Sequence, residues 1–153
     1  VAELVRLTFG AAAEVEYKSS GAPYIINAGQ AYISVSHSKG AAAVALSRKP
    51  VGIDLELIRP YPERVQRKYS AAERAYVLQH GDLGFFEIWT FKEAVLKCLE
   101  KGLRTGIAGV PAIFGGRLKK HCKGLNIVCK SINGFCLCAA FEEDTDCIEI
   151  LEV

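Results

Sequence analysis

The sequence has 153 residues, of which 50% are hydrophobic and 24% charged, so it can build one sizeable core. This composition excludes a disordered chain, and 14 glycines with 5 prolines exclude a collagen-like one. The 19 basic and 17 acidic residues leave a net charge of +2, which argues against a nucleic-acid module held by a basic face. We expect one compact domain, or two small lobes that share a core.

No apolar run reaches the roughly 18 residues that a membrane helix needs, and the start of the sequence lacks a signal-peptide pattern. We therefore expect a cytoplasmic protein that binds neither a membrane nor nucleic acid. The sequence begins with Val1 and contains no Met, so an extension upstream of Val1 stays open.

The cysteines are even in number, but a chain of this length and apolar content does not need disulfides. There is no Cys-x-x-Cys pair, and His121 has no partner at zinc-finger spacing. We predict buried or half-buried free thiols, because free cysteine behaves as a small hydrophobic residue. The six are Cys98, Cys122, Cys129, Cys136, Cys138 and Cys147.

In chain order, the first third of the sequence is predicted to be β structure. Residues 31–36 alternate in polarity, residues 41–47 are apolar, and a polar turn lies between them. These two strands predict a hairpin with Ser36 and His37 at its tip. A third strand is predicted over residues 51–58, before an Arg-Pro break.

The middle third is predicted to be helical. Residues 62–69 carry a mixed amphipathic pattern, and Ser70 followed by Glu73 is a capping box that starts a second helix, which runs to about His80. A Gly-Asp break separates it from a long helix over residues 84–101, where apolar residues recur at helical spacing.

The final third is predicted to return to strands. Residues 125–131 and 135–141 flank Asn133-Gly134, and Asn-Gly between apolar runs is the strongest short signal for a hairpin. A polar turn over residues 142–146 and a last strand over residues 147–151 follow.

Two acids on the strand over residues 51–58 are the first candidates for chemistry. Asp54 and Glu56 face the same side, roughly 7 Å apart along the strand. On a strand with an apolar reverse face this pair would repel unless a cation neutralised it, and hard oxygen ligands select Mg²⁺ or Ca²⁺ over zinc. The alternative is an edge strand that shows two acids to solvent, and the spacing leaves both interpretations open.

The long helix carries a second set of candidates. Trp89, Glu93 and Lys97 are four residues apart and lie along one stripe. A Glu–Lys surface pair worth a few tenths of a kcal/mol is the alternative. Trp89 argues against it, because an indole is seldom left in water and this face should then pack inward. A third carboxylate and an ammonium group could complete a metal and phosphate site.

Together these segments resemble the 4′-phosphopantetheinyl transferases, specifically the larger surfactin-synthetase-activating class. The pattern of that family couples Gly-Ile-Asp-x-Glu on a strand to Trp-x-x-Lys-Glu-Ala-x-x-Lys on a later helix. Here the two motifs occupy residues 52–56 and 89–97. Ser-His-Ser at residues 36–38, Tyr-Ser-Ala-Ala-Glu at 69–73 and Lys-Gly-Leu at 101–103 also match, and the resemblance runs from about residue 4 to residue 116.

The resemblance implies an activity. Such enzymes transfer the phosphopantetheine arm of coenzyme A to a serine of an apo acyl, peptidyl or aryl carrier protein and release adenosine 3′,5′-bisphosphate. They serve fatty acid, polyketide or nonribosomal peptide biosynthesis. Transfer of this kind depends mostly on positioning and on neutralising the charge that develops, which a metal and an ammonium group supply.

The resemblance also implies roles for particular residues. Asp54, Glu56 and Glu93 would hold Mg²⁺, and Glu93, or a water at the metal, would take the proton from the carrier serine. Lys97 would contact phosphate. The coenzyme A phosphates would be bound by Ser36 and His37, with Gly21 and Pro23 near the adenine.

For the fold, the resemblance implies an α+β arrangement of antiparallel strands packed on helices, in two pseudo-symmetric lobes. Residues 1–50 would be a shortened, β-rich N-terminal lobe, and residues 51–153 the α+β lobe with the metal and phosphate motifs, in one compact unit. A monomer or a weak homodimer is expected.

Two departures from the family pattern keep a second hypothesis open. Ala22 stands where the family has Lys or Arg, and the family's basic N-terminal segment has no counterpart in the given sequence. Either the chain extends upstream of Val1, or Arg48, Lys49 and other basic residues substitute. The alternative is a non-catalytic module on the same scaffold that binds a carrier protein or a nucleotide. The retained acids and Lys97 favour the enzyme, and a cysteine-based zinc protein is disfavoured by the ligand spacing.

Overall fold

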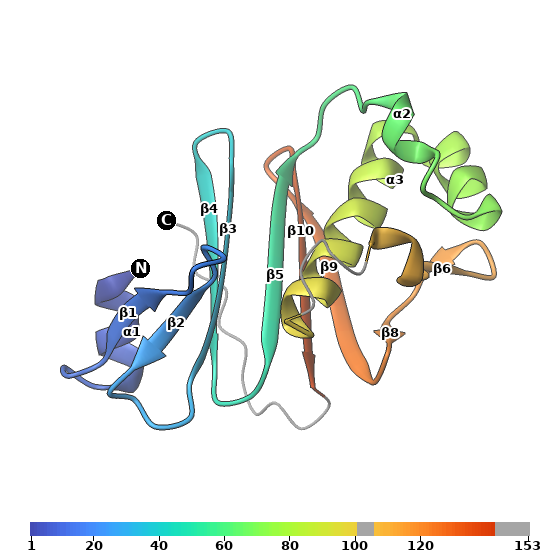
Figure 1. The fold of residues 1–153 in the computed structure, drawn as a ribbon. Helices are drawn as coiled ribbons and strands as arrows, with labels where there is room; N and C mark the ends of the chain where they lie inside the picture. The colour runs from blue at the N-terminus through green and yellow to red at the C-terminus, as the bar shows by residue number, and fades with distance from the viewer. Residues whose placement is uncertain (101–105, 143–153) are drawn as a thin grey trace.

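The structure is a computed structural model that describes residues 1–100 and 106–142. Its elements follow one another along the chain as drawn in Figure 1. Within these residues, no helix combines the length and the apolar character needed to span a lipid bilayer. The elements are α1 (Ala2–Phe9), β1 (Glu14–Tyr17), β2 (Pro23–Ile26), β3 (Tyr32–Ser38), β4 (Ala41–Ser47), β5 (Val51–Leu57), α2 (Glu63–Gln66), α3 (Ala71–Cys98), the 3₁₀ turn η2 (Ile107–Gly109), β6 (Ile113–Phe114), β7 (Arg117–Leu118), β8 (His121–Cys122), β9 (Leu125–Ile132) and β10 (Phe135–Glu142).

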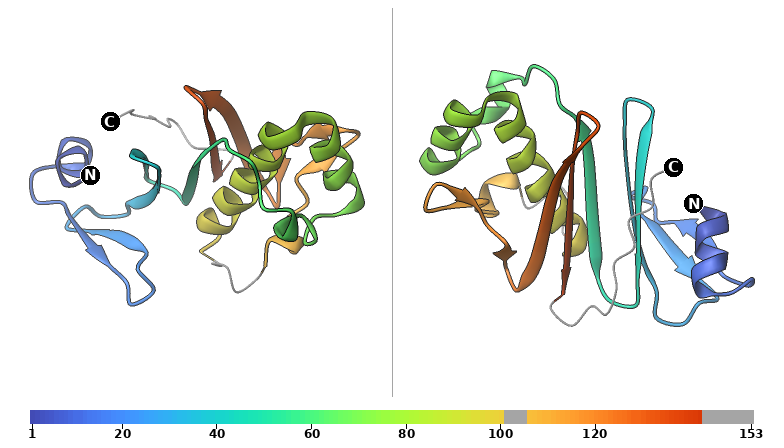
Figure 2. Two further views of the ribbon diagram at one scale, coloured as in Figure 1. Left: turned by 90° about the horizontal axis from the view of Figure 1, so that it is seen from above. Right: turned by 180° about the vertical axis from the view of Figure 1, so that it is seen from behind.

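An antiparallel sheet in the order β5-β10-β9-β8 forms the centre of the fold. Seen from behind, β9 and β10 lie in front of α3, so the long helix covers one face of this sheet (Figure 2). The predicted hairpin is confirmed: Asn133 and Gly134 join β9 to β10 and both have positive φ, as a two-residue turn of this kind requires. The mixed, antiparallel α+β character of the prediction is therefore confirmed.

The hairpin of β3 and β4 is confirmed, but the position of its tip was predicted wrongly. The turn is made by Lys39 and Gly40, with φ of 47° and 86°, and β3 continues through Ser38. Ser36 and His37 therefore lie inside the strand. Side chains alternate along a strand, so these two residues face opposite sides.

Helix α3 merges the two helices that the sequence predicts. Its capping box is confirmed: Ser70 Oγ accepts from the Glu73 amide, and the Glu73 carboxylate accepts from the Ser70 amide. The predicted break at Gly81 is a kink with φ 61° and ψ −141°, after which the helix resumes. The helix predicted over residues 62–69 is limited to the single turn of α2.

The predicted β structure of the first third is wrong at its start, where α1 is a helix. Its residues Ala, Glu, Leu and Arg are strong helix formers, and Val5 and Phe9 lie four apart on one face. That face packs against Ala13 and Ile25 in a small cluster of its own. The last predicted strand, and the end of the long helix near residue 101, lie outside the described residues.

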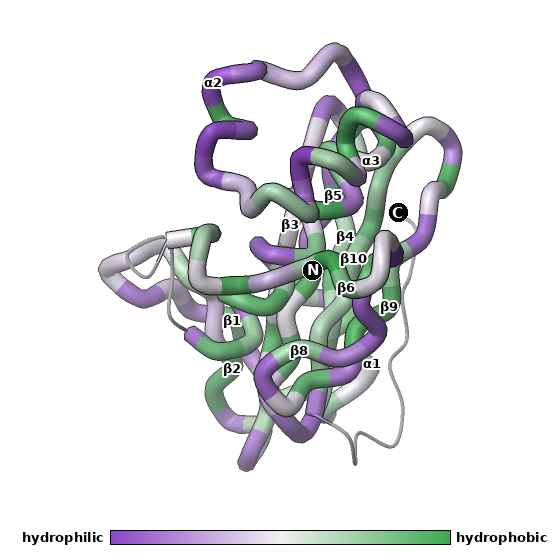
Figure 3. The backbone as a smooth tube through the Cα atoms, turned by 90° about the vertical axis from the view of Figure 1, so that its right-hand side faces the viewer, coloured by the Kyte–Doolittle hydropathy of each residue, from purple (hydrophilic) through white to green (hydrophobic). Residues whose placement is uncertain are grey.

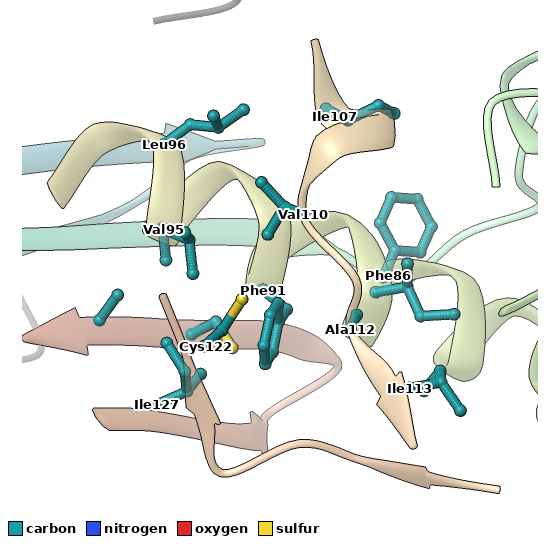
Figure 4. Packing of buried hydrophobic residues seen from close by; sticks show 14 of the residues in the cluster. Phe86, Phe91, Val95, Leu96, Ile107, Val110, Ala112, Ile113, Cys122 and Ile127 are labelled. Carbon is teal, nitrogen blue, oxygen red and sulfur yellow. The ribbon is translucent and has the colours of Figure 1, made fainter. Parts of the chain in front are cut away.

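The main core lies between α3, strands β8 to β10 and the segment from η2 to β6 (Figure 4). Phe85 and Phe86 belong to it, with 2% exposure each. A second cluster lies where β4 meets β5 and β10. In Figure 3 the segment that carries α2 is drawn mainly in hydrophilic colours, in keeping with its exposed Arg64, Arg67 and Lys68.

The prediction of free, buried thiols is confirmed for three cysteines and wrong for two. Cys98, Cys122 and Cys136 are free and buried. Cys129 and Cys138 form a disulfide, because they lie directly opposite each other on β9 and β10 with a Cα–Cα distance of 4.1 Å. Composition could not predict this pairing, since it depends on the register of the two strands. Cys147 lies outside the described residues.

Candidate functional site

The site begins where α3 lies directly on strand β5. A Cβ atom on Gly52 would come within 2.0 Å of the carbonyl oxygen of Ala94 and 2.5 Å of the backbone nitrogen of Cys98. Only a glycine allows the helix backbone to come this close to the strand. Asp54 and Glu56 share the face of Gly52 by strand alternation, so they point toward the helix that carries Glu93 and Lys97.

Asp54 is the central carboxylate of the site and is only 6% exposed. Its Oδ1 accepts hydrogen bonds from Ser36 Oγ at 2.9 Å and from Lys97 Nζ at 2.8 Å. Its Oδ2 is buried and has no hydrogen-bond partner among residues 1–100 and 106–142. Burial raises the pKa of Asp54, and the charge and hydrogen bond of Lys97 oppose that rise.

Lys97 joins the helix to two strands. Its Nζ donates to Asp54 Oδ1, to the carbonyl of Ile53 on β5 at 3.0 Å and to the carbonyl of Val35 on β3 at 3.5 Å. An ammonium group has three hydrogens, so each of them faces a protein oxygen. The positive charge is thereby fixed beside Asp54.

Glu93 lies one helical turn before Lys97 and is half-buried, as the inward-facing stripe predicted. Its Oε1 is buried, and no group in the described part of the chain forms a hydrogen bond with it. Burial raises the pKa of Glu93, the negative charge of Asp54 raises it further, and the charge of Lys97 lowers it. Two carboxyl groups that both resist ionisation form a pair that a cation would stabilise.

Glu56, the third predicted acid, has local partners. Its Oε2 accepts from Ser38 Oγ at 2.9 Å and pairs with Arg59 at 3.1 Å. Arg59 also donates to the carbonyl of Leu57 and lies over the ring of Phe86. Much of the negative charge of Glu56 is therefore balanced within the chain.

The donor set fits a magnesium ion in its chemistry. Across residues 1–100 and 106–142, no group of three His, Cys, Asp or Glu side chains is arranged to hold a metal ion. Mg²⁺, however, is usually bound through one or two carboxylates, with water and substrate phosphate completing its shell. The buried, unpartnered oxygens of Asp54 and Glu93 are hard donors of that kind.

The remaining predicted residues lie further out. His37 is exposed and faces away from β5, on the side of β3 opposite Ser36. Gly21 belongs to the turn between β1 and β2, and Pro23 begins β2. In the same turn, Lys18 pairs with Glu100 at 3.3 Å, which ties the turn to the end of α3.

The side chain of Arg48 is bound within the N-terminal part of the chain. It follows β4 at the end of the hairpin remote from the Lys39-Gly40 turn. Its guanidinium donates to the carbonyls of Ala28 and Gln30 and lies over the ring of Phe9. Arg48 therefore holds the N-terminal elements together.

One buried ion pair was missed by the sequence interpretation. Lys92 and Glu73 are 0% and 2% exposed, and their Nζ and Oε1 atoms lie 2.7 Å apart. Lys92 also donates to the carbonyls of Ile107 and Val110, while Glu73 accepts from the Ala112 amide. The pair therefore anchors the segment from η2 to β6 on the helix. The capping box pointed to Glu73, but nothing local pointed to its partner.

Comparisons with known proteins point to one superfamily. The model of the 4′-phosphopantetheinyl transferase superfamily matches residues 50–123, which include both acid-bearing motifs. The 4′-phosphopantetheinyl transferase psf-1 of Bacillus pumilus is 28% identical over 102 residues, covering 63% of this chain and 44% of that protein. A 4′-phosphopantetheinyl transferase of Bacillus subtilis is 30% identical over 89 residues, covering 54% of this chain and 39% of that protein.

A third relative is the 4′-phosphopantetheinyl transferase gsp of Aneurinibacillus migulanus, 32% identical over 78 residues, which cover 47% of this chain and 32% of that protein. The chain thus spans less than half the length of each of these relatives. Both motifs lie inside the family match, and all three relatives carry the same enzyme name. Over residues 50–123 the chain is therefore similar to the 4′-phosphopantetheinyl transferase superfamily.

Proposed function

We propose that this chain transfers the 4′-phosphopantetheine arm of coenzyme A to a serine of an apo acyl, peptidyl or aryl carrier protein and releases adenosine 3′,5′-bisphosphate. The observation that carries the proposal is a pair of buried oxygens, Asp54 Oδ2 and Glu93 Oε1, beside the ammonium group of Lys97. Neither oxygen has a hydrogen-bond partner among the residues that the structure describes. Unpartnered buried carboxylate oxygens are costly, and they are retained where a ligand satisfies them. Asp54 belongs to the strand motif that resembles the family, and Glu93 and Lys97 belong to the helix motif.

Asp54 and Glu93, with Glu56 as the third acid, would hold Mg²⁺. When bound, this ion supplies positive charge that neutralises the diphosphate of coenzyme A. Lys97 adds a fixed positive charge at the same place. Its three hydrogens face protein oxygens, so a direct bond to phosphate would replace the longest of these contacts, the one to the carbonyl of Val35.

Glu93 is the proposed base for the carrier serine. Its Oε1 has no hydrogen-bond partner among the described residues, so this oxygen can accept a proton. A water held at the metal is the alternative base.

Several parts of the proposal rest on the family resemblance. His37 would bind a coenzyme A phosphate, with Gly21 and Pro23 near the adenine, and the resemblance gives Ser36 the same role as His37. His37 is exposed, whereas the hydroxyl of Ser36 already donates to Asp54. The cytoplasmic location, the two-lobe division near residue 50 and the monomer or weak homodimer complete the proposal.

A labelling assay tests the proposal. The purified protein is incubated with Mg²⁺, a coenzyme A that carries a fluorophore on its thiol, and a panel of apo carrier proteins. We expect covalent labelling of at least one carrier, and its loss in Asp54→Asn and Glu93→Gln. Glu63→Gln is the control, because Glu63 on α2 is exposed and the change is also from glutamate to glutamine. This variant should label the carrier as the wild type does.

Two outcomes would contradict the proposal. Full labelling by Asp54→Asn would remove this carboxylate from the mechanism. Binding of coenzyme A without labelling of any carrier would favour the non-catalytic module. Two observations motivate that alternative: Ala22 stands in place of a basic residue, and Arg48 is bound to backbone carbonyls.

A further inference from the structure

Strand β3 lies beside β5, yet the two belong to separate sheets. Serine hydroxyls, rather than a backbone ladder, join them. Ser34, Ser36 and Ser38 occupy alternate positions and therefore share one face of β3. Their Oγ atoms accept hydrogen bonds from every second backbone amide of β5. The donors are Ile53, Leu55 and Leu57, at 3.0, 3.1 and 3.2 Å respectively.

Two of the three serines make a second bond, to the acids of the site. Ser36 donates to Asp54 Oδ1 and Ser38 donates to Glu56 Oε2, both at 2.9 Å. A hydroxyl has one hydrogen, so accepting the amide bond leaves that hydrogen for the carboxylate. By the same spacing Ser34 corresponds to Gly52, which has no side chain to accept the hydroxyl hydrogen.

We propose that Ser36 and Ser38 are positioning residues of the metal site, each fixing one oxygen of its carboxylate so that the other oxygen is held ready for the cation. Asp54 shows the division most clearly, because Oδ1 takes both Ser36 and Lys97 while Oδ2 is buried and unpartnered. The inference rests on the proposed function. It assigns the Ser36 hydroxyl to Asp54 rather than to a coenzyme A phosphate.

The contrast among the three serines supplies the experiment. Ser34→Ala removes only an acceptor for an amide of β5, whereas Ser36→Ala and Ser38→Ala remove the same acceptor and the carboxylate donor as well. Hydrogen-bond partners of metal ligands are typically worth about 10–100-fold in metal affinity. Binding of Mn²⁺, counted by electron paramagnetic resonance with and without coenzyme A, measures that affinity apart from catalysis.

We expect Ser36→Ala to weaken Mn²⁺ binding about 10-fold or more, with a smaller loss for Ser38→Ala, because Arg59 also holds Glu56. Ser34→Ala should stay within about twofold of the wild type, since it leaves both carboxylates untouched. Urea unfolding of the three variants checks that their stabilities fall by similar amounts.

Equal Mn²⁺ affinities for Ser34→Ala and Ser36→Ala would overturn the inference. A loss of coenzyme A affinity in Ser36→Ala without metal, at unchanged Mn²⁺ affinity, would assign the hydroxyl to phosphate instead. If the wild type labels carriers and binds Mn²⁺ while all three variants behave alike, only the positioning role fails. If the wild type binds no Mn²⁺, the proposed function fails and this role with it.

Discussion

Replacement of Lys92 by methionine tests the buried ion pair that fixes helix α3 to the segment from η2 to β6. Methionine has nearly the same length and fills the same space, so the change removes the ammonium group and little packing. Of the donors in the described residues, it leaves the buried carboxylate of Glu73 the amides of Ser70 and Ala112. It also removes the hydrogen bonds to the Ile107 and Val110 carbonyls.

The expected loss is large because an uncompensated charge remains in the core. Breaking a buried pair by removing one partner costs about 3–5 kcal/mol. For a chain of this size, 1 kcal/mol corresponds to about 2–4 °C, so the midpoint of thermal unfolding should fall by about 6–20 °C. In the Lys92→Met background, Glu73→Gln keeps the shape and an acceptor oxygen but removes the charge. The double variant should therefore recover more than about 1 kcal/mol.

Urea unfolding followed by circular dichroism and by the fluorescence of Trp89, the single tryptophan, measures these losses. Lys68→Met is the matched control, since Lys68 is exposed, and it should change the unfolding free energy by no more than about 0.5 kcal/mol. A loss below about 1 kcal/mol in Lys92→Met would refute the reasoning. So would a double variant less stable than Lys92→Met itself.

Two further predictions concern the backbone contact and pH. Gly52→Ala should lower the unfolding free energy by about 3 kcal/mol or more and weaken Mn²⁺ binding, because its Cβ would meet the backbone of α3. Gly109→Ala is the control: there is open space around this position, so the unfolding free energy should hardly change in the same assay. Burial alone would raise the pKa of Glu73, but hydrogen bonds from the Ala112 amide and from Lys92 outweigh it and lower the pKa. The stability that Glu73 contributes should therefore be complete above about pH 5 and lost as the pH falls through 4.5, the ordinary value, and below. The gap in unfolding free energy between wild type and Glu73→Gln should narrow toward acid pH, and parallel curves would contradict this.

Elements with strong local signals could be predicted from the sequence. Asn133-Gly134 specifies its own turn geometry, and Ser70 with Glu73 specifies a helix start, so both were placed correctly. Gly81 was placed correctly as an interruption, but packing on both sides let the helix continue past it. Helix α1 was not predicted, because the alternating polarity of the strands that follow it favoured β structure for the whole first third.

The site was predictable where spacing carries the information. Strand alternation put Asp54 and Glu56 on one face, and helical periodicity put Glu93 and Lys97 on another. Their meeting depends on Gly52, whose role appears only when the helix lies against the strand. The partner of Lys92 could not be predicted, because neighbouring positions on a helix diverge by about 100° and only tertiary packing decides which one is buried.

The serine contacts along β5 have a consequence for association between molecules. An edge strand with free amides invites pairing with a strand from another chain, which is a common start of aggregation. On β5 the amides at Ile53, Leu55 and Leu57 already donate to hydroxyls. A strand from another molecule therefore could not pair with these amides. Ser36 and Ser38, proposed above to orient the acids, thus also protect this edge of the sheet together with Ser34.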